Sequence, residues 1–505
     1  MSENILLQKP IRFGRIILNF ILFFILISYN SFSADFELTP QMQKAYSEIL
    51  KMRIYSGRNL LLADKNQPNG FRAYLESYAD MIELLASENP NDYDEFIDQQ
   101  SDRLSFISSL DKSSPYNKLL QAEVRLHSAF VKLKFGHEIK GAGDIIKAYK
   151  LLEANAKQFP NFISNQKSLG LLHILIGSTP ENYLWVAHIL GLRGNINQGL
   201  TELQNVIQKD PFFRDEAQMI DYVVHSYILK INEKQLAGFK NFIESHPDNL
   251  LFQFFGITTY IKEGKSEEAL DLLELKRKPG YVPLPVLEYL KSDILLQKGQ
   301  YHQAVTGYLY YINNHKGLNF IKDANYKLFL CYWLNNEDTK AMPYLQKVEE
   351  VGETIVESDK SALKYSKNYL AKKPGPQSKI LMKARLACDG GYYDQALSFL
   401  GNLTEAQFES LSDKAEFNYR KGRIYQRMDD SLKAVPLFER AINLSSGQNW
   451  SFGANAALQT GYIFQQKGDR MKAKYFFEKA ISFKKHEYKN SVDNKAKAAL
   501  NEMGF

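Results

Sequence analysis

The pairs His137-Glu138 and His486-Glu487 are the nearest approach in this 505-residue chain to a catalytic metal signature. A zinc protease motif needs a second histidine four residues after the first, and neither pair has one. The sequence also lacks a phosphate loop ending in Gly-Lys-Ser/Thr, a Gly-x-Ser-x-Gly elbow and a Cys-x-x-Cys motif. Acidic pairs such as Glu267-Glu268 and Glu349-Glu350 are typical of solvated helix faces. We therefore expect a protein that is not an enzyme and that carries no metal or cofactor.

The two cysteines, Cys331 and Cys388, are the remaining candidates for reactive groups. A secreted disulfide scaffold of this size would carry many more cysteines. One long-range disulfide and two separate thiols are both compatible with the spacing. We favour two buried thiols, because free cysteine is among the most buried residue types.

The elements that would position any site are helical hairpins of regular period. Nine times a Gly, Asn or Asp stands five positions before a small residue that opens an apolar helical stretch. Because these three residue types adopt the left-handed conformation that ends a helix, each pair predicts a turn followed by a second helix. The pairs are Gly143/Ala148, Gly194/Gly199, Asn232/Ala237, Gly264/Ala269, Gly299/Ala304, Asn336/Ala341, Gly391/Ala396, Asp429/Ala434 and Gly468/Ala473. Their spacing, mostly 32–39 residues with gaps of 51 and 55, predicts stacked hairpins.

The last two units show most clearly how such hairpins would pack. Gly422 is followed by Tyr425, Ala434, Phe438 and Ala441, and the same spacing recurs from Gly461 through Phe464, Ala473 and Phe477 to Ala480. Small residues on both helices of a hairpin would let the backbones approach, with the aromatic rings filling the space beside the contact. Ala434, Phe438 and Ala441 fall on one helical face.

These residues resemble the tetratricopeptide repeat family, through the stretches 421–425 with 433–441 and 460–462 with 472–480. The resemblance is specific over 415–485, fair over 250–350 and 378–403, and weak over 117–247. It implies an all-α solenoid of about nine or more helical hairpins wound into a right-handed superhelix. Gly191-Leu192-Arg193-Gly194-Asn195 with Gln198-Gly199-Leu200 loosely resembles the tetratricopeptide repeat protein 39 branch, and no function is transferred from it.

Breaks in the period suggest the domain organisation. We expect an N-terminal helical cap over 34–116, a first repeat array over 117–350 with an insertion near 161–190, and a second array over 378–505. The long gap at 351–377 reads as a helix followed by a linker or hinge.

Residues 1–33 have the features of a secretory signal peptide. Lys9, Arg12 and Arg15 precede an apolar run from Ile16 to Tyr29, and Ser31-Phe32-Ser33 offers a small-x-small cleavage site. The run is shorter than the roughly 20 residues that span a bilayer, which favours cleavage over an uncleaved anchor. We therefore expect a periplasmic or secreted protein.

Charge and composition limit the class of partner. A formal net charge of +6, spread over both signs, does not suggest nucleic-acid binding. We expect a protein-binding scaffold of the cell envelope with no small-molecule substrate. The alternatives are an accessory subunit of an outer-membrane transport, secretion or assembly complex, associated peripherally, and a glycan- or peptidoglycan-binding module.

The resemblance implies that the first helix of each hairpin lines a concave groove. Tyr, Trp and Arg are the residues that dominate protein-binding hot spots. The partner-binding residues predicted on this basis are Tyr289, Tyr326, Trp333, Arg385, Tyr419, Arg423, Gln426, Arg427, Tyr462, Gln465 and Gln466.

Overall fold

The computed structural model describes residues 34–64, 69–178, 190–375, 377–486 and 488–505. Within these ranges all regular structure is helical, as expected from the repeats. The predicted signal peptide and residues 179–189 of the predicted insertion lie outside the described residues. None of the helices in the described part of the chain has the length and apolar character needed to span a bilayer.

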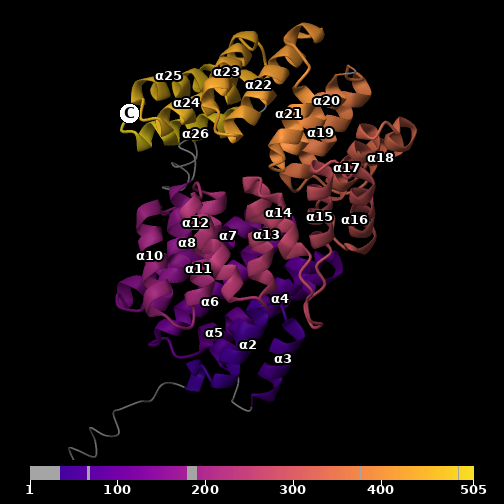
Figure 1. Cartoon of the computed structure of the whole chain (residues 1–505). Helices are drawn as coiled ribbons and strands as arrows, with labels where there is room; N and C mark the ends of the chain where they lie inside the picture. The colour runs from indigo at the N-terminus through magenta and orange to yellow at the C-terminus, as the bar shows by residue number, and fades with distance from the viewer. Residues whose placement is uncertain (1–33, 65–68, 179–189, 376, 487) are drawn as a thin grey trace, which may run out of the picture.

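The chain is an all-α solenoid, and we divide it into three parts (Figure 1). The N-terminal helices are α2 (Pro40–Leu50), α3 (Ile54–Ala63), α4 (Gly70–Ser87), α5 (Tyr93–Ser109), α6 (Pro115–Lys134) and α7 (Glu138–Gln158). The middle hairpins are α8 (Gln166–Gly177) with α10 (Ile196–Lys209), α11 (Arg214–Tyr227) with α12 (Glu233–Ser245), α13 (Leu250–Glu263) with α14 (Ser266–Leu273), α15 (Val286–Gln297) with α16 (Tyr301–Asn314), and α17 (Ile321–Leu334) with α18 (Asp338–Glu350).

After α19 (Glu357–Ala371) come the C-terminal hairpins: α20 (Ser378–Asp389) with α21 (Tyr393–Leu400), α22 (Leu411–Arg427) with α23 (Ser431–Leu444), and α24 (Ser451–Gln466) with α25 (Arg470–Ser482). Helix α26 (Lys489–Glu502) packs on α24 and α25 and follows the last hairpin. Short 3-10 turns occur at Ala34–Phe36, Pro90–Asp92, Ile163–Asn165 and Glu405–Gln407.

Six of the nine predicted turns are confirmed by backbone geometry. Each has a positive φ of 60° to 85°, the left-handed conformation that reverses the chain at the end of a helix. The six are Gly264, Gly299, Asn336, Gly391, Asp429 and Gly468. The small residue five positions later is fully buried in every one of these units. The sequence pattern is therefore reliable from residue 264 onward.

The three earlier positions lack the left-handed conformation that the pattern predicts. Gly143 lies inside α7, and the chain reverses instead at Gly136, whose φ is 79°. Asn232 caps the start of α12 with a reciprocal capping box, and the following Ala237 is exposed while Leu236 is buried. Asn can serve either end of a helix, so residue type alone could not separate the two roles.

Gly194, the third, stands in the loop before α10, where a Cβ would lie 2.1 Å from the backbone nitrogen of Gly177. The need for a glycine there comes from close backbone contact and not from a left-handed turn. Gly199 is buried as predicted, because a Cβ would lie 2.4 Å from the carbonyl oxygen of Gly170 on α8. Small residues thus allow α8 and α10 to touch.

The N-terminal helices do more than end the array, because they pack along the loops that lead into the middle hairpins. Tyr46 of α2 donates to Glu216 at 2.7 Å, and Lys51 pairs with Asp248 at 2.9 Å. Further along, the nitrogen of Val282 donates to the Met52 carbonyl at 2.9 Å, and Asn319 donates to Glu88 at 2.6 Å. These contacts reach the starts of α11, α13, α15 and α17 in turn.

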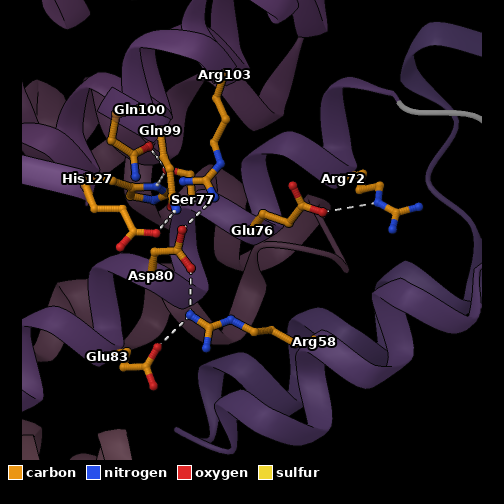
Figure 2. A network of polar contacts seen from close by, with 11 residues as sticks. Arg58, Arg72, Glu76, Ser77, Asp80, Glu83, Gln99, Gln100, Arg103 and His127 are labelled. Atoms are coloured by element: carbon orange, nitrogen blue, oxygen red, sulfur yellow. Dashed lines mark hydrogen bonds and ion pairs between the residues drawn. The ribbon is translucent and has the colours of Figure 1, made fainter. Parts of the chain in front are cut away.

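Polar contacts hold the N-terminal helices to one another (Figure 2). Asp80 of α4 accepts from Arg58 of α3 at 2.6 Å and from Arg103 of α5 at 2.5 Å. Ser77 of α4 donates to Gln100 at 2.6 Å and lies 2.8 Å from the His127 Nδ1 of α6. Burial lowers the pKa of His127 well below its ordinary value. The network therefore joins four successive helices through one face of α4.

The C-terminal hairpins meet the opposite ends of the middle hairpins, at the turns between their helices (Figure 1). Tyr392 donates to Glu267 at 2.7 Å, and Gln395 donates to the Lys298 carbonyl at 3.3 Å. A Cβ on Gly391 would lie 1.9 Å from the Gly264 carbonyl oxygen, so the two turns touch directly. The middle hairpins are therefore held from both ends, and the solenoid coils back on itself.

The segment predicted as a helix and hinge contains α19, which packs on α17 and α18. Its Asp359 accepts backbone N–H groups of Phe320 at 2.7 Å and Asp323 at 2.9 Å. This carboxylate ties α19 to the start of α17. The domain boundaries and the hinge stay predictions.

Candidate functional site

The predicted groove residues divide into buried, partly buried and exposed positions. Tyr289 and Trp333 are each 3% exposed, so their prediction as surface residues is wrong. Tyr326, Tyr419, Arg423, Gln426, Arg427, Tyr462 and Gln465 are partly buried. Arg385 and Gln466 are exposed. The exposed positions both belong to the C-terminal hairpins.

Tyr289 is a core residue because its ring lies among aromatic side chains of the neighbouring helices. Its centroid is 5.7 Å from that of Tyr308 and 5.1 Å from that of Tyr311. Its hydroxyl donates to Asp323 and accepts from Lys327 at 2.7 Å. Burial and the nearby carboxylates raise its pKa well above the ordinary value. Tyr289 therefore belongs to a buried cluster of charged side chains and does not line a groove.

Trp333 of α17 is likewise buried, because its ring packs against α19. Its ring stacks on Phe329 at 5.6 Å and meets Tyr369 edge to face at 5.9 Å. The ammonium of Lys379 lies 5.6 Å from the ring. Helix α19 lies in a gap of the repeat pattern, and its Tyr369 covers Trp333.

Tyr326 and Arg385 mark a surface where helices α17, α19 and α20 approach one another. The Tyr326 ring lies 4.7 Å from Tyr365 of α19. Arg385 pairs with Asp389 at 3.6 Å while its side chain stays 44% exposed. Tyr365 was missed by sequence reasoning, because α19 interrupts the repeat and has no counterpart in the other units.

Helices α22 and α24 bring the remaining predicted residues together. Arg423 donates through Nη1 to Gln426 at 2.6 Å and to Gln459 of α24 at 2.7 Å. Gln459 was not predicted, although it lies on the same helical face as Tyr462, three residues later. The inner faces of α22 and α24 are therefore joined by polar side chains.

The rings of Tyr419 and Tyr462 pack against neighbouring aromatic side chains and are only partly exposed. Tyr419 lies 6.2 Å from Phe438 and 6.0 Å from Phe452, with the Arg420 guanidinium over its ring. The Tyr462 ring lies 5.2 Å from Phe477, and the ammonium of Lys230 from the middle hairpins stands 5.6 Å from it. Burial raises the pKa of Tyr462 to about 12. These rings support the inner face while partly exposed.

A cavity of about 300 Å³ lies at the junction between the middle and C-terminal hairpins. We call it the junction cavity. It is lined by Ile261 and Lys262 of α13, Gln297 of α15, Cys388 and Asp389 of α20, and Arg423 and Arg427 of α22. Arg427 donates to the Glu263 carbonyl at 3.5 Å across the junction. Two predicted residues therefore line a pocket that single-repeat periodicity could not reveal, because its walls come from distant hairpins.

Neither cysteine is arranged for chemistry. Cys331 and Cys388 are free and buried, in agreement with the preferred interpretation of the sequence. Burial raises the pKa of Cys388 to about 11, so its thiol stays protonated at neutral pH. Within the described residues no cluster of three or more His, Cys, Asp or Glu side chains could hold a metal ion.

Comparison with known proteins identifies one repeat of the chain. The family model of the tetratricopeptide repeat matches residues 415–447, which cover most of α22 and all of α23. No curated protein matches the sequence. Among solved structures, the TPR domain of P58(IPK) aligns at 12% identity over 85% of this chain and 98% of that chain, with a TM-score of 0.21.

Proposed function

Because the chain is a helical-repeat solenoid that contains a tetratricopeptide repeat, we propose that it is a non-enzymatic, protein-binding scaffold of the cell envelope. Its binding surface would be the inner face of the C-terminal hairpins, formed by α20, α22 and α24. One observation carries this choice. Arg385 and Gln466 are exposed on this face, whereas Tyr289, predicted for the same role in the middle hairpins, is buried.

The side chains of this face suit an extended polar segment of a partner. Arg385 offers a guanidinium fork for a carboxylate or a main-chain carbonyl, and Gln466 can both donate and accept. Tyr462 of this face, with Tyr326 of α17 and Tyr365 of α19 in front of α20, supplies partly exposed rings against which apolar side chains would pack. Arg and Tyr in such settings are frequent hot spots of protein interfaces.

Residues 1–33 support export, because their basic start, short apolar run and small-x-small site match a cleavable signal peptide. Mass spectrometry of the mature protein from its native host tests this part. We expect a chain that begins at Ala34. A chain that keeps its first residues in the membrane fraction would instead indicate an anchor.

A second candidate is contact through the outer face, as in an accessory subunit of a larger complex. Leu432 of α23 is 83% exposed, and Met471 and Tyr475 of α25 are also exposed. Leu432 and Met471 each stand two residues before the small residue of their unit. Two equivalent apolar positions on neighbouring outer helices favour a partner on that side.

The test of the first proposal is affinity capture from envelope extracts with the full chain carrying Arg385→Glu and Gln466→Glu. We expect these changes to remove a specific partner, because they place negative charge on the inner face. Lys433→Glu is the matched control, since Lys433 is an exposed cation on outer helix α23. If the control removes the partner and the inner-face variant retains it, the outer face is the binding surface.

A further inference from the structure

The junction cavity contains an unusual balance of charge. Two carboxylates stand at it, and each already has a cationic partner. Asp389 pairs with Arg385 at 3.6 Å, and Glu263, next to the wall residue Lys262, pairs with that lysine at 3.1 Å. The positive charge of the cavity wall that has no carboxylate partner therefore belongs to Arg423 and Arg427 of α22.

Arg423 and Arg427 hydrogen-bond only to neutral groups within the described residues. Arg423 donates to the side-chain oxygens of Gln426 and Gln459, and Arg427 donates to a backbone carbonyl. Arg420, one turn earlier on the same helix, instead forms an ion pair with Glu416 at 3.0 Å. The contrast shows that α22 neutralises one arginine internally and leaves two uncompensated at the cavity.

Two partly buried guanidinium groups without a counterion favour an anionic ligand. Arginine stays protonated at all ordinary pH values, so it cannot relieve its desolvation by losing the charge. The four-residue spacing places Arg423 and Arg427 on one face of α22, next to each other. Lys262 and Gln297 of the middle hairpins line the opposite side.

We propose that the junction cavity binds a phosphate group, held by Arg423 and Arg427, as part of a small phosphorylated ligand. A phosphate monoester carries about −1.5 to −2 charge at neutral pH, which matches two uncompensated arginines better than a single carboxylate does. Its oxygens also accept the paired N–H donors of a guanidinium fork. The cavity has the volume of roughly ten water molecules, so a phosphate and a short organic body fit together.

A bound phosphate would also join two parts of the solenoid. The arginines belong to the C-terminal hairpins, whereas Lys262 and Gln297 belong to the middle hairpins. Ligand binding would therefore stabilise the docked arrangement of the two parts. This inference goes beyond the proposed scaffold function and does not depend on it.

Isothermal titration of the full chain with inorganic phosphate, against sodium chloride at equal ionic strength, tests the site. We expect saturable binding of one phosphate and a higher melting temperature. Arg423→Gln and Arg427→Gln should each weaken the affinity about tenfold, as expected for the loss of a charge-assisted hydrogen bond. Arg420→Gln is the matched control, and it should bind phosphate as the unchanged protein does.

Two further ligands separate the possible sources of the anion. Glycerol 1-phosphate binding more tightly than inorganic phosphate would support a phosphorylated small molecule, and the reverse order would support free phosphate in the same site. Acetate binding as tightly as phosphate would overturn the preference for a dianion. Absence of phosphate binding by the unchanged protein, or equal affinity in all three arginine variants, would overturn the site itself.

Discussion

The middle and C-terminal hairpins are built from the same unit but packed in different ways. The C-terminal hairpins meet through small residues such as Ala434 and Ala473, both fully buried, with Phe438 and Phe477 beside them. The middle hairpins bury charge as well. Lys327 pairs with Asp293 at 2.7 Å and with Asp323 at 2.8 Å within an aromatic core.

The difference follows from what surrounds each part. The middle hairpins receive the N-terminal helices at one end and the C-terminal hairpins at the other, so their side chains must satisfy neighbours distant in sequence. The C-terminal hairpins meet the middle hairpins along one side only, and Arg385 and Gln466 of their inner face stay exposed. The turn pattern nevertheless holds in both parts, because Gly264, Gly299 and Asn336 of the middle hairpins have the same left-handed conformation as the turns of the C-terminal hairpins.

The largest difference in unfolding free energy between the two parts is expected on substitution of Lys167 in the middle hairpins. Its ammonium is buried between Glu123 and Glu216, at 2.9 Å from each. Lys167→Met would leave two carboxylates unpaired, and loss of one member of such a cluster costs about 3–5 kcal/mol. Chemical denaturation should show this loss of unfolding free energy.

The matched control for that change is Lys433→Met in the C-terminal hairpins. Lys433 forms an ion pair with Asp430 on the surface. Exposed pairs contribute little, so we expect no measurable change in the denaturation midpoint. Equal effects of the two substitutions would contradict the contrast between the buried ionic packing of the middle part and the apolar packing of the C-terminal part.

The next effect concerns glycine in the C-terminal hairpins. A Cβ on Gly461 would lie 2.5 Å from the Phe477 ring, so Gly461→Ala should cost about 1–3 kcal/mol through overpacking. Gly143→Ala within α7 meets nothing within 4 Å and should stabilise the protein by about 0.5–1 kcal/mol. Thermal unfolding of both variants should therefore give shifts of opposite sign.

A smaller effect is expected from pH at Asp359, which joins α19 to the middle hairpins. Burial raises the pKa of Asp359 to about 6, above the ordinary value near 3.8. The folded state therefore binds this proton more tightly than the unfolded state, and the contribution present at low pH is lost as pH rises through about 6. The loss amounts to about 1–2 kcal/mol, less than the roughly 3 kcal/mol that the full pKa difference implies.

Unfolding curves of the unchanged protein and of Asp359→Asn between pH 4 and 7.5 test this assignment. The stability difference between the two proteins should change across this range, because Asn cannot titrate. His127 and other groups titrate in both proteins and cancel in the difference. A difference that does not vary with pH would show that Asp359 does not titrate near 6.

Much of the fold could be predicted from the sequence, because turn geometry and helix approach are local. The left-handed turns from Gly264 onward and the buried alanines that follow them need only the residues of one hairpin. The errors at Gly143 and Asn232 arise because residue type alone does not separate a helix interior or a helix start from a helix end.

The candidate site was predicted less well, because exposure depends on contacts between distant units. Arg423 and Arg427, which were predicted for the groove, line the junction cavity, and Lys262 and Gln297 complete this cavity from helices more than 120 residues away. Tyr289 and Trp333 fit the repeat pattern of a groove, but neighbouring aromatic rings bury them. The sequence of a single hairpin does not show which of its side chains the neighbouring helices will bury.

Site-specific photo-crosslinking in the native host tests the central claim most directly. A photoreactive residue would be placed in the full chain at Gln466 on the inner face, and separately at Leu432 on the outer face. The scaffold proposal predicts one discrete protein adduct from position 466 and none from position 432. An adduct from position 432 with none from position 466 would contradict it, and would place the partner on the outer face.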